Sequence, residues 1–307
     1  MAGIWEGQRF VPRFPFAAGV EYALLTRTAN GWSEVARFPG PPAPQSGSTE
    51  IVSIDPGAAV VPENLLRFSV TFSAPMEEGS AAGRVRLLDG DGVELPGALL
   101  EMPPEMWDRP RRRLTVLLEP GRIKRGLVPN MQAGPPLTAG TTVTLVVDAS
   151  LRDATGAELT RGCERTYQVV EPLRSRVDPG VWHISWPEIG TVDDLVVEFD
   201  RPLDRALVAR CLRGGQPGAA VLDAGGRHWR WRAREPWAAV DLHIHPDLED
   251  LAGNSVRRVF DRDLQVRGDD PLTLPRTASG LVLVPGGRAF SGLLDSADSW
   301  IPRTAER

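Results

Sequence analysis

The chain has 307 residues, room for two or three domains of ordinary size, and its hydrophobic fraction of 42% is enough for packed cores and excludes global disorder. Its 35 basic and 40 acidic residues give a formal charge of −5, which argues against nucleic acid as a partner. The sequence has no run of about 18 apolar residues, so it predicts no membrane span. The 31 glycines and 28 prolines, with little helical periodicity, favour an all-β chain of short strands joined by turns.

The first part of the chain contains three β-rich runs, at 8–14, 20–25 and 32–38. Two or three strands are too few to bury a two-sheet core. Residues 1–47 are therefore predicted to form an incomplete N-terminal β-segment followed by a Pro-rich linker. The first residues lack a charged region followed by an apolar one, so the sequence predicts no signal peptide in this chain.

The next unit, at 48–172, is predicted to be a β-module. Its strand candidates are a run that begins at Glu50 and the runs 66–73, 84–88, 113–118, 142–148 and 164–170. Residues 102–132 are the longest departure from a minimal sandwich, and long loops on a rigid scaffold are where binding residues concentrate.

This insert is predicted to be a binding surface, because Trp and Arg dominate the energetics of interfaces. The candidate binding residues are Trp107, Arg111, Arg112, Arg113, Arg122 and Lys124. The basic runs could also take phosphate or acidic polymers. A solvated loop with local ion pairs is the structural alternative.

The third unit, at 173–268, holds five of the nine tryptophans of the chain. They are Trp182, Trp186, Trp229, Trp231 and Trp237. Trp229 and Trp231 are two residues apart in a predicted strand, so they share one face. A Trp-rich core is one interpretation, and an aromatic platform for a polysaccharide is the other.

A possible metal site lies in the same unit. Asp241, His243 and His245 alternate along a predicted strand, and zinc and copper accept imidazole and carboxylate ligands. In the structural alternative the intervening residues Val240, Leu242 and Ile244 are the buried set, and the polar residues face solvent. No other cofactor is predicted.

Residues 269–307 are predicted to be a C-terminal tail with one apolar strand near 280–284. If this strand were unpaired, its exposed backbone edge would promote aggregation. It is therefore expected to pair with the N-terminal β-segment or with the adjacent module. The two cysteines, Cys163 and Cys211, fall in different units, and neither has a CxxC partner.

Two self-matches link the second and third units. Residues 148–159 match 245–256 at an offset of 97 (245 minus 148). A β-rich run precedes each copy, and another follows it, at 165–170 after the first copy and at 263–266 after the second. Residues 68–76 match 195–203 at an offset of 127 (195 minus 68). Matches in the same order along the chain indicate a repeated structural unit.

The segments FSVTFSAPM (68–76), LLDGDGVELPG (87–97) and DLEDLAGN (247–254) resemble bacterial immunoglobulin-like modules of the S-layer-protein type. The resemblance covers about residues 48–267 and implies tandem immunoglobulin-like β-sandwiches, with no catalytic residues to carry over. Such modules are mostly exported, which favours an extracytoplasmic location in the periplasm or at the cell surface.

We therefore expect an all-β, non-catalytic structural or protein-binding scaffold, whose partner is another protein or a component of the cell envelope. A carbohydrate-binding accessory module that uses the Trp-rich unit is the second hypothesis. A metal-dependent enzyme is the third, although the sequence contains no GxSxG, HExxH, P-loop or GxGxxG motif.

Overall fold

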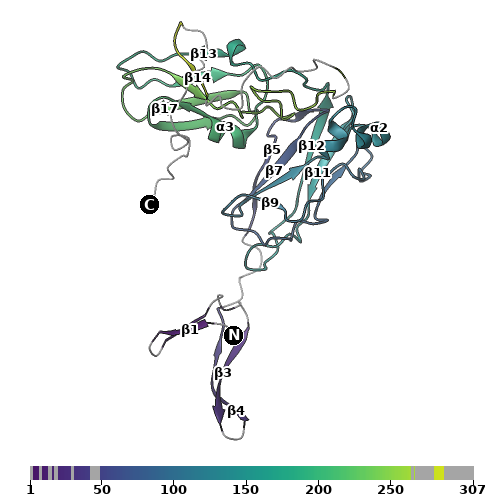
Figure 1. Cartoon of the computed structure of the whole chain (residues 1–307), viewed down its shortest axis with the longest axis vertical. Coiled ribbons are helices and arrows are strands. Elements are labelled where there is room, and N and C mark those ends of the chain that lie inside the picture. The colour runs from purple at the N-terminus through teal and green to yellow at the C-terminus, as the bar shows by residue number, and fades with distance from the viewer. Residues whose placement is uncertain are drawn as a thin grey trace.

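The structure is a computed structural model that describes residues 3–6, 9–12, 16, 20–28, 31–41, 49–263, 266 and 280–286. Its main features are two β-sandwiches that follow one another along the chain, preceded by two β-ribbons (Figure 1). The all-β prediction and the sandwich architecture are confirmed. None of the helices in the described part of the chain is both long and apolar enough to cross a membrane.

The N-terminal β-segment consists of two antiparallel pairs. Three of its strands lie at the predicted runs 8–14, 20–25 and 32–38, and the strand at 3–6 was not predicted. β1 (Gly3–Glu6) pairs with β2 (Arg9–Pro12), and β3 (Glu21–Thr28) pairs with β4 (Gly31–Pro39). In Figure 1 the β3–β4 ribbon lies apart from the sandwiches. Its large apolar side chains are exposed, and Trp32 is 71% exposed. The predicted linker is 39–48. Pro39 instead ends β4, and residues 42–48 lie outside the described residues.

The first sandwich has the strand order of an immunoglobulin module. One sheet runs β5 (Ile51–Asp55), β7 (Arg67–Phe72), β10 (Arg113–Leu117) and β9 (Met106–Trp107). The other runs β6 (Val60–Pro62), β12 (Cys163–Val170), β11 (Thr142–Val147) and β8 (Val85–Leu88). β6 and β12 are parallel and the other pairs antiparallel. The predicted strands of this unit are all present.

The insert at 102–132 is more ordered than a loop. It contains β9 and two short helices, α1 (Pro120–Ile123) and α2 (Val128–Ala133). Glu119 caps α1 by accepting a hydrogen bond from Gly121 N at 2.9 Å. Both helices begin with Pro in their first turn, where its missing N–H is not needed.

The second sandwich follows the same order. One sheet runs β13 (His183–Ser185), β14 (Leu195–Glu198), β17 (His228–Ala233) and β16 (Gly218–Leu222). The other runs β15 (Leu212–Gly214), β18 (Leu242–Ile244) and β19 (Leu281–Leu283). A 3-10 turn (Pro179–Val181) precedes β13, and α3 (Arg205–Cys211) precedes β15.

The last strand of the second sandwich comes from the tail. β19 pairs with β18 at the sheet position that β12 has beside β11 in the first sandwich. Of the expected strand at 263–266 the structure describes Asp263 and Val266, and both lie outside any strand. The segment before it instead packs against the first sandwich, where Phe260 contacts the margin of that core.

Two hydrophobic cores lie between the sheets. The first is centred on Phe68, Phe72 and Tyr167, and the second on Trp229 and Trp237. The matched segments lie side by side in both sandwiches, because Met76 pairs with Asp153 in the first and Leu203 pairs with Asp250 in the second.

Candidate functional site

The predicted binding residues at the β9–β10 turn have structural roles. Trp107 is half-buried at the margin of the first core, its ring centroid 5.8 Å from that of Phe72. Its indole N–H donates to Glu105 at 2.7 Å. Asp108 Oδ1 accepts from the backbone N–H groups of Arg112 and Arg113, at 2.8 and 2.9 Å. The turn is therefore preorganised, with Arg111 and Arg112 exposed at its tip.

Arg122 and Lys124 lie elsewhere, so the six predicted residues do not form one surface. Arg122 donates to five backbone carbonyls, those of Pro96, Gly97, Ala133, Gly134 and Pro135. It thereby ties α1 and α2 to the loop before β9. The Lys124 ammonium lies 4.4 Å from the ring centroid of Phe260, in the second half of the chain. Burial, and then Arg258 and Arg262, lower the pKa of Lys124.

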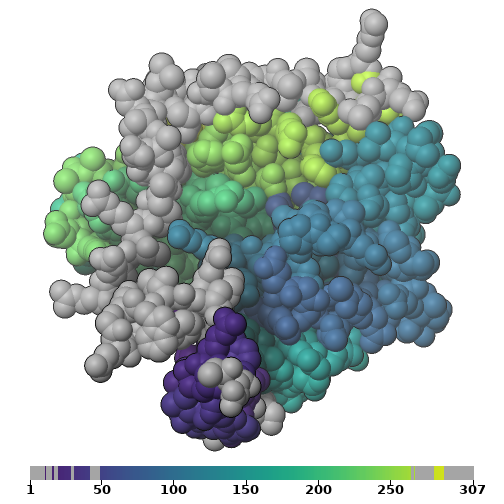
Figure 2. All heavy atoms as spheres, turned by 60° about the horizontal axis from the view of Figure 1, so that its bottom comes forward, coloured from purple at the N-terminus to yellow at the C-terminus, as the bar shows by residue number. Residues whose placement is uncertain are grey.

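The sequence-distant contact at Lys124 belongs to a joint between the two sandwiches. In Figure 2 atoms of the second sandwich, green to yellow-green, lie directly against blue and teal atoms of the first. Arg67 on β7 forms ion pairs with Asp204, at 3.1 Å, and with Glu249. Arg205 at the start of α3 forms one with Asp55 at 2.8 Å. Four of these five side chains, those of Arg67, Asp204, Glu249 and Asp55, are no more than about one-fifth exposed, so their charges are screened less than surface charges.

Asp261 is a deeply buried acidic residue of the joint. Its side chain is 1% exposed and lies between two guanidinium groups, Arg125 Nε at 3.2 Å and Arg174 Nε at 2.9 Å. Asn64 also donates to Asp261 Oδ2 at 3.3 Å. Arg125 comes from the insert of the first sandwich, and Arg174 from the connection between the two. A buried carboxylate with such partners fixes their relative position.

Backbone groups complete the joint. Leu66 N donates to Leu251 O at 2.9 Å, a main-chain bond between the sandwiches. A Cβ on Gly57 would lie 2.1 Å from the carbonyl oxygen of Ala224, so only glycine permits this approach. A small cavity of about 90 Å³ remains beside these residues, lined in part by Arg67 and Arg205.

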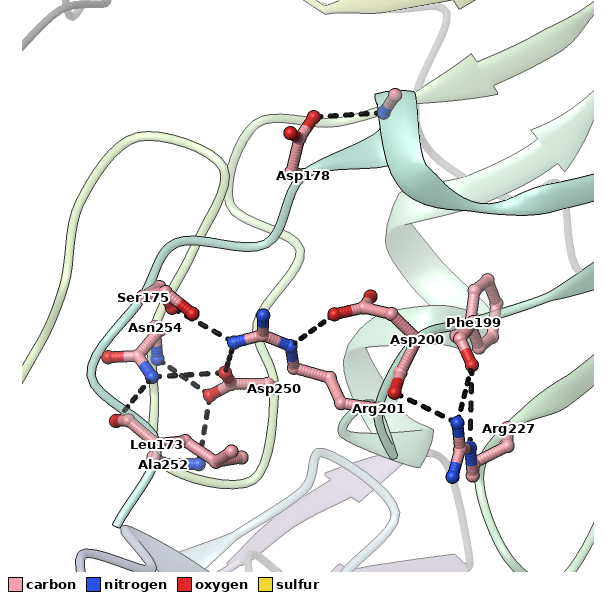
Figure 3. Close-up of polar contacts among 11 residues, drawn as sticks. Leu173, Ser175, Asp178, Phe199, Asp200, Arg201, Arg227, Asp250, Ala252 and Asn254 are labelled. Atoms are coloured by element: carbon pink, nitrogen blue, oxygen red, sulfur yellow. Dashed lines mark hydrogen bonds and ion pairs between the residues drawn. The ribbon is translucent and has the colours of Figure 1, made fainter.

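The connection itself is held by two asparagines, Asn64 and Asn254, and Figure 3 shows the contacts of Asn254. The carbonyl of Leu173 accepts from Asn64 at 2.7 Å and from Asn254 at 2.9 Å, and Leu173 N donates to Asn64 at 2.9 Å. Asn254 in turn donates to Asp250 Oδ2 at 3.0 Å. Arg201 reaches the same carboxylate at 3.4 Å. The network thus links the first sandwich, the connection and the turn that carries Asp250.

Asp250 and its counterpart Asp153 occupy equivalent turns in the two sandwiches, but their pKa values are shifted in opposite directions. Asp250 is fully buried, and this burial raises its pKa to about 6, although Asn254, Arg201 and Ala252 favour the charged form. For Asp153, burial acts in the same direction, but hydrogen bonds from Thr155 and Thr49 prevail and lower the pKa. The turn in the second sandwich is therefore the pH-sensitive one.

The predicted metal ligands come together only in part. His243 Nε2 lies 2.9 Å from Asp241 Oδ2, and His245 instead accepts from Asp247 N at 3.2 Å. In the part of the chain that the structure describes, no three His, Cys, Asp or Glu side chains group as metal ligands. The structural alternative is present, since Val240, Leu242 and Ile244 are buried. Metal binding at these residues stays a prediction.

The tryptophans of the second sandwich belong mainly to its core. Trp182, Trp229 and Trp237 are buried, and Trp186 and Trp231 are partly buried against that core. Trp231 also donates to Gln216 O at 3.2 Å. The expected alternation along β17 is confirmed. Trp229 is fully buried and Trp231 partly buried on that face, which favours the core interpretation over an open platform for a sugar.

A second candidate surface is a groove of about 830 Å³ on the first sandwich. It lies between β8 of one sheet and β10 of the other, and the segment 97–106 forms part of its lining. Its apolar lining continues into the margin of the first core, for instance at Val85, Leu99 and Val116.

The sequence interpretation missed most joint residues. Asn64, Arg67, Asp204 and Asp261 are separated by up to 197 positions (261 minus 64), and charge complementarity at such a distance leaves no local pattern. One signal was present, because the matched turn at 247–254 is followed by a segment that aligns Phe260 with Cys163. Phe260 is much larger than Cys163, and this difference was compatible with a contact that the first sandwich does not make at Cys163.

Comparisons with known proteins are consistent with a divergent sequence. No family model and no curated protein matches the chain. Among solved structures, a similar one is native alpha-2-macroglobulin from Escherichia coli spanning domains MG0-NIE-MG1. The similarity has a TM-score of 0.26 and 10% identity, and covers 50% of this chain and 42% of that one. The chain therefore matches less than half the length of that structure.

Proposed function

We propose that the chain is a non-catalytic, extracytoplasmic scaffold, in which two immunoglobulin-like modules built on one plan are held in a fixed relative orientation. Modules of the S-layer-protein type, which the sequence resembles, commonly act as such spacers. The scaffold would present a partner-binding surface to another protein or to a component of the cell envelope.

The observation that carries the proposal is the joint. Linkers between independent modules are usually exposed and make few contacts across the boundary. Here the connection is bonded through Leu173 to both sandwiches, and Asp261 is buried between arginines of the insert and of the connection. Buried ion pairs at the joint between the two modules support a role for the chain in fixing their relative orientation.

Location and shape are tested separately. A membrane-impermeant biotinylation reagent applied to intact source cells should label the chain, and labelling only after lysis would contradict an extracytoplasmic location. Small-angle X-ray scattering should fit one arrangement of the modules. Asp261→Ala combined with Arg205→Ala should enlarge the radius of gyration while circular dichroism stays unchanged, and an unchanged radius would contradict the spacer role of the joint.

A further inference from the structure

The groove on the first sandwich has walls from both sheets, which suits an extended chain. β8 contributes Val85 and Leu87, β10 contributes Leu114 and Val116, and Leu99 of the crossing segment completes the apolar lining. The groove volume of about 830 Å³ lies in the range of formed binding pockets, about 300–1,000 Å³. Leu87 and Leu114 belong to the core, whereas Val85, Leu99 and Val116 are only partly covered.

The charged side chains of the groove are nearly all acidic. Five glutamates and one arginine line it: Glu78, Glu94, Glu101, Glu105, Glu119 and Arg86. Glu105 and Glu119 bond nearby N–H groups, so they are held in place. Glu78, Glu94 and Glu101 are exposed. At the end near Gly97 the guanidinium of Arg122 is occupied by backbone carbonyls.

We propose that this groove binds an extended segment of a partner protein in which apolar residues alternate with lysine or arginine. An extended segment points successive side chains to opposite sides. Its apolar side chains then enter the groove and its cations meet the glutamates at the rim. The glutamates repel phosphate groups and attract cations, and the leucine and valine lining favours apolar side chains over sugar hydroxyls, so a basic protein segment fits the site best.

The groove is then the surface by which the proposed scaffold binds its partner. The inference rests on the proposed scaffold function only for its biological context. The test uses the full chain and a fluorescein-labelled peptide in which lysine alternates with valine, followed by fluorescence anisotropy. A peptide with glutamate in place of lysine is the probe control. The lysine peptide should bind, more weakly as salt is added, and the glutamate peptide should not.

Variants locate the binding. Glu94→Lys combined with Glu101→Lys should weaken binding of the lysine peptide about tenfold. Met102 also lines the groove, and Met102→Gln, which makes that lining more polar, should weaken binding a few-fold. Glu158→Lys combined with Glu164→Lys changes the net charge equally, away from the groove, and should have no such effect. Thermal melts of each variant establish that it is folded.

Three results would overturn the inference: no binding of the lysine peptide, equal binding of both peptides, or binding that the groove variants leave unchanged. Sedimentation showing self-association that the same variants abolish would make a second copy of this chain the occupant, and would also overturn it. None of these results bears on the joint, so a failure here is distinguishable from a failure of the scaffold proposal.

Discussion

Replacing Asp261 with alanine should weaken the joint strongly. The carboxylate is 1% exposed, and it pairs with Arg125 and Arg174, whose side chains are 34% and 41% exposed. A hydrogen bond to a charged group contributes about 1.5–3 kcal/mol. Because both arginines can rehydrate after the change, two full contributions would be an overestimate. We expect a loss of about 3 kcal/mol in the free energy of unfolding.

Urea unfolding measures this loss. Tryptophan fluorescence reports mainly on the second sandwich, and circular dichroism reports on both. The matched control is Asp247→Ala, which removes an ion pair with Arg257 in which the aspartate is 58% exposed, and should cost less than about 1 kcal/mol. Equal losses in the two variants would refute the reasoning that burial makes the Asp261 pairs strong.

Three further changes test other parts of the structure. The pKa of Asp250 in the folded chain, about 6, exceeds its ordinary value of 3.8, so folding favours the protonated carboxyl. Asp250 therefore stabilises the folded state fully below pH 3.8. The free energy of unfolding should fall by about 3 kcal/mol as the pH rises from 3.8 to about 6. Asp250→Asn should remove this fall from the stability–pH curve, and an unchanged curve would contradict the assignment. Trp107→Ala should cost about 2 kcal/mol in urea unfolding, since half the ring lies on the core; an unchanged midpoint would restore the interpretation of Trp107 as a free binding residue. Leu283→Asp should destabilise the second sandwich by about 3 kcal/mol, because Leu283 is buried on β19, and a chain as stable as the wild type would show that β19 is dispensable.

Local patterns in the sequence were sufficient for the architecture. Alternating apolar residues placed the strands of the first sandwich, since side chains on one face of a strand must all reach the same core. The alternation from Trp229 to Ala233 likewise predicted which face of β17 is buried. The exposed ribbon of residues 21–39 follows from the same reasoning, because two strands alone have no second sheet to pack against.

Tertiary contacts decided what the sequence left open. The run at 263–266 has a β-like pattern, but Phe260 and Asp261 before it are engaged with the first sandwich, and β19 takes the place beside β18. The binding prediction grouped Trp107 with Arg122 because both lie in the insert at 102–132 and because Trp and Arg dominate interface energetics. In the fold the two residues have different roles: Trp107 packs against the first core, whereas the guanidinium of Arg122 donates hydrogen bonds to backbone carbonyls.

The distance between the two sandwiches tests the fixed joint most directly. Spin labels at Val93→Cys and Val221→Cys, both exposed positions, with Cys163 replaced by serine, allow this distance to be measured by double electron–electron resonance. A fixed joint predicts one narrow distance distribution, which Asp261→Ala broadens. A broad distribution in the chain with Asp261 intact would contradict the account.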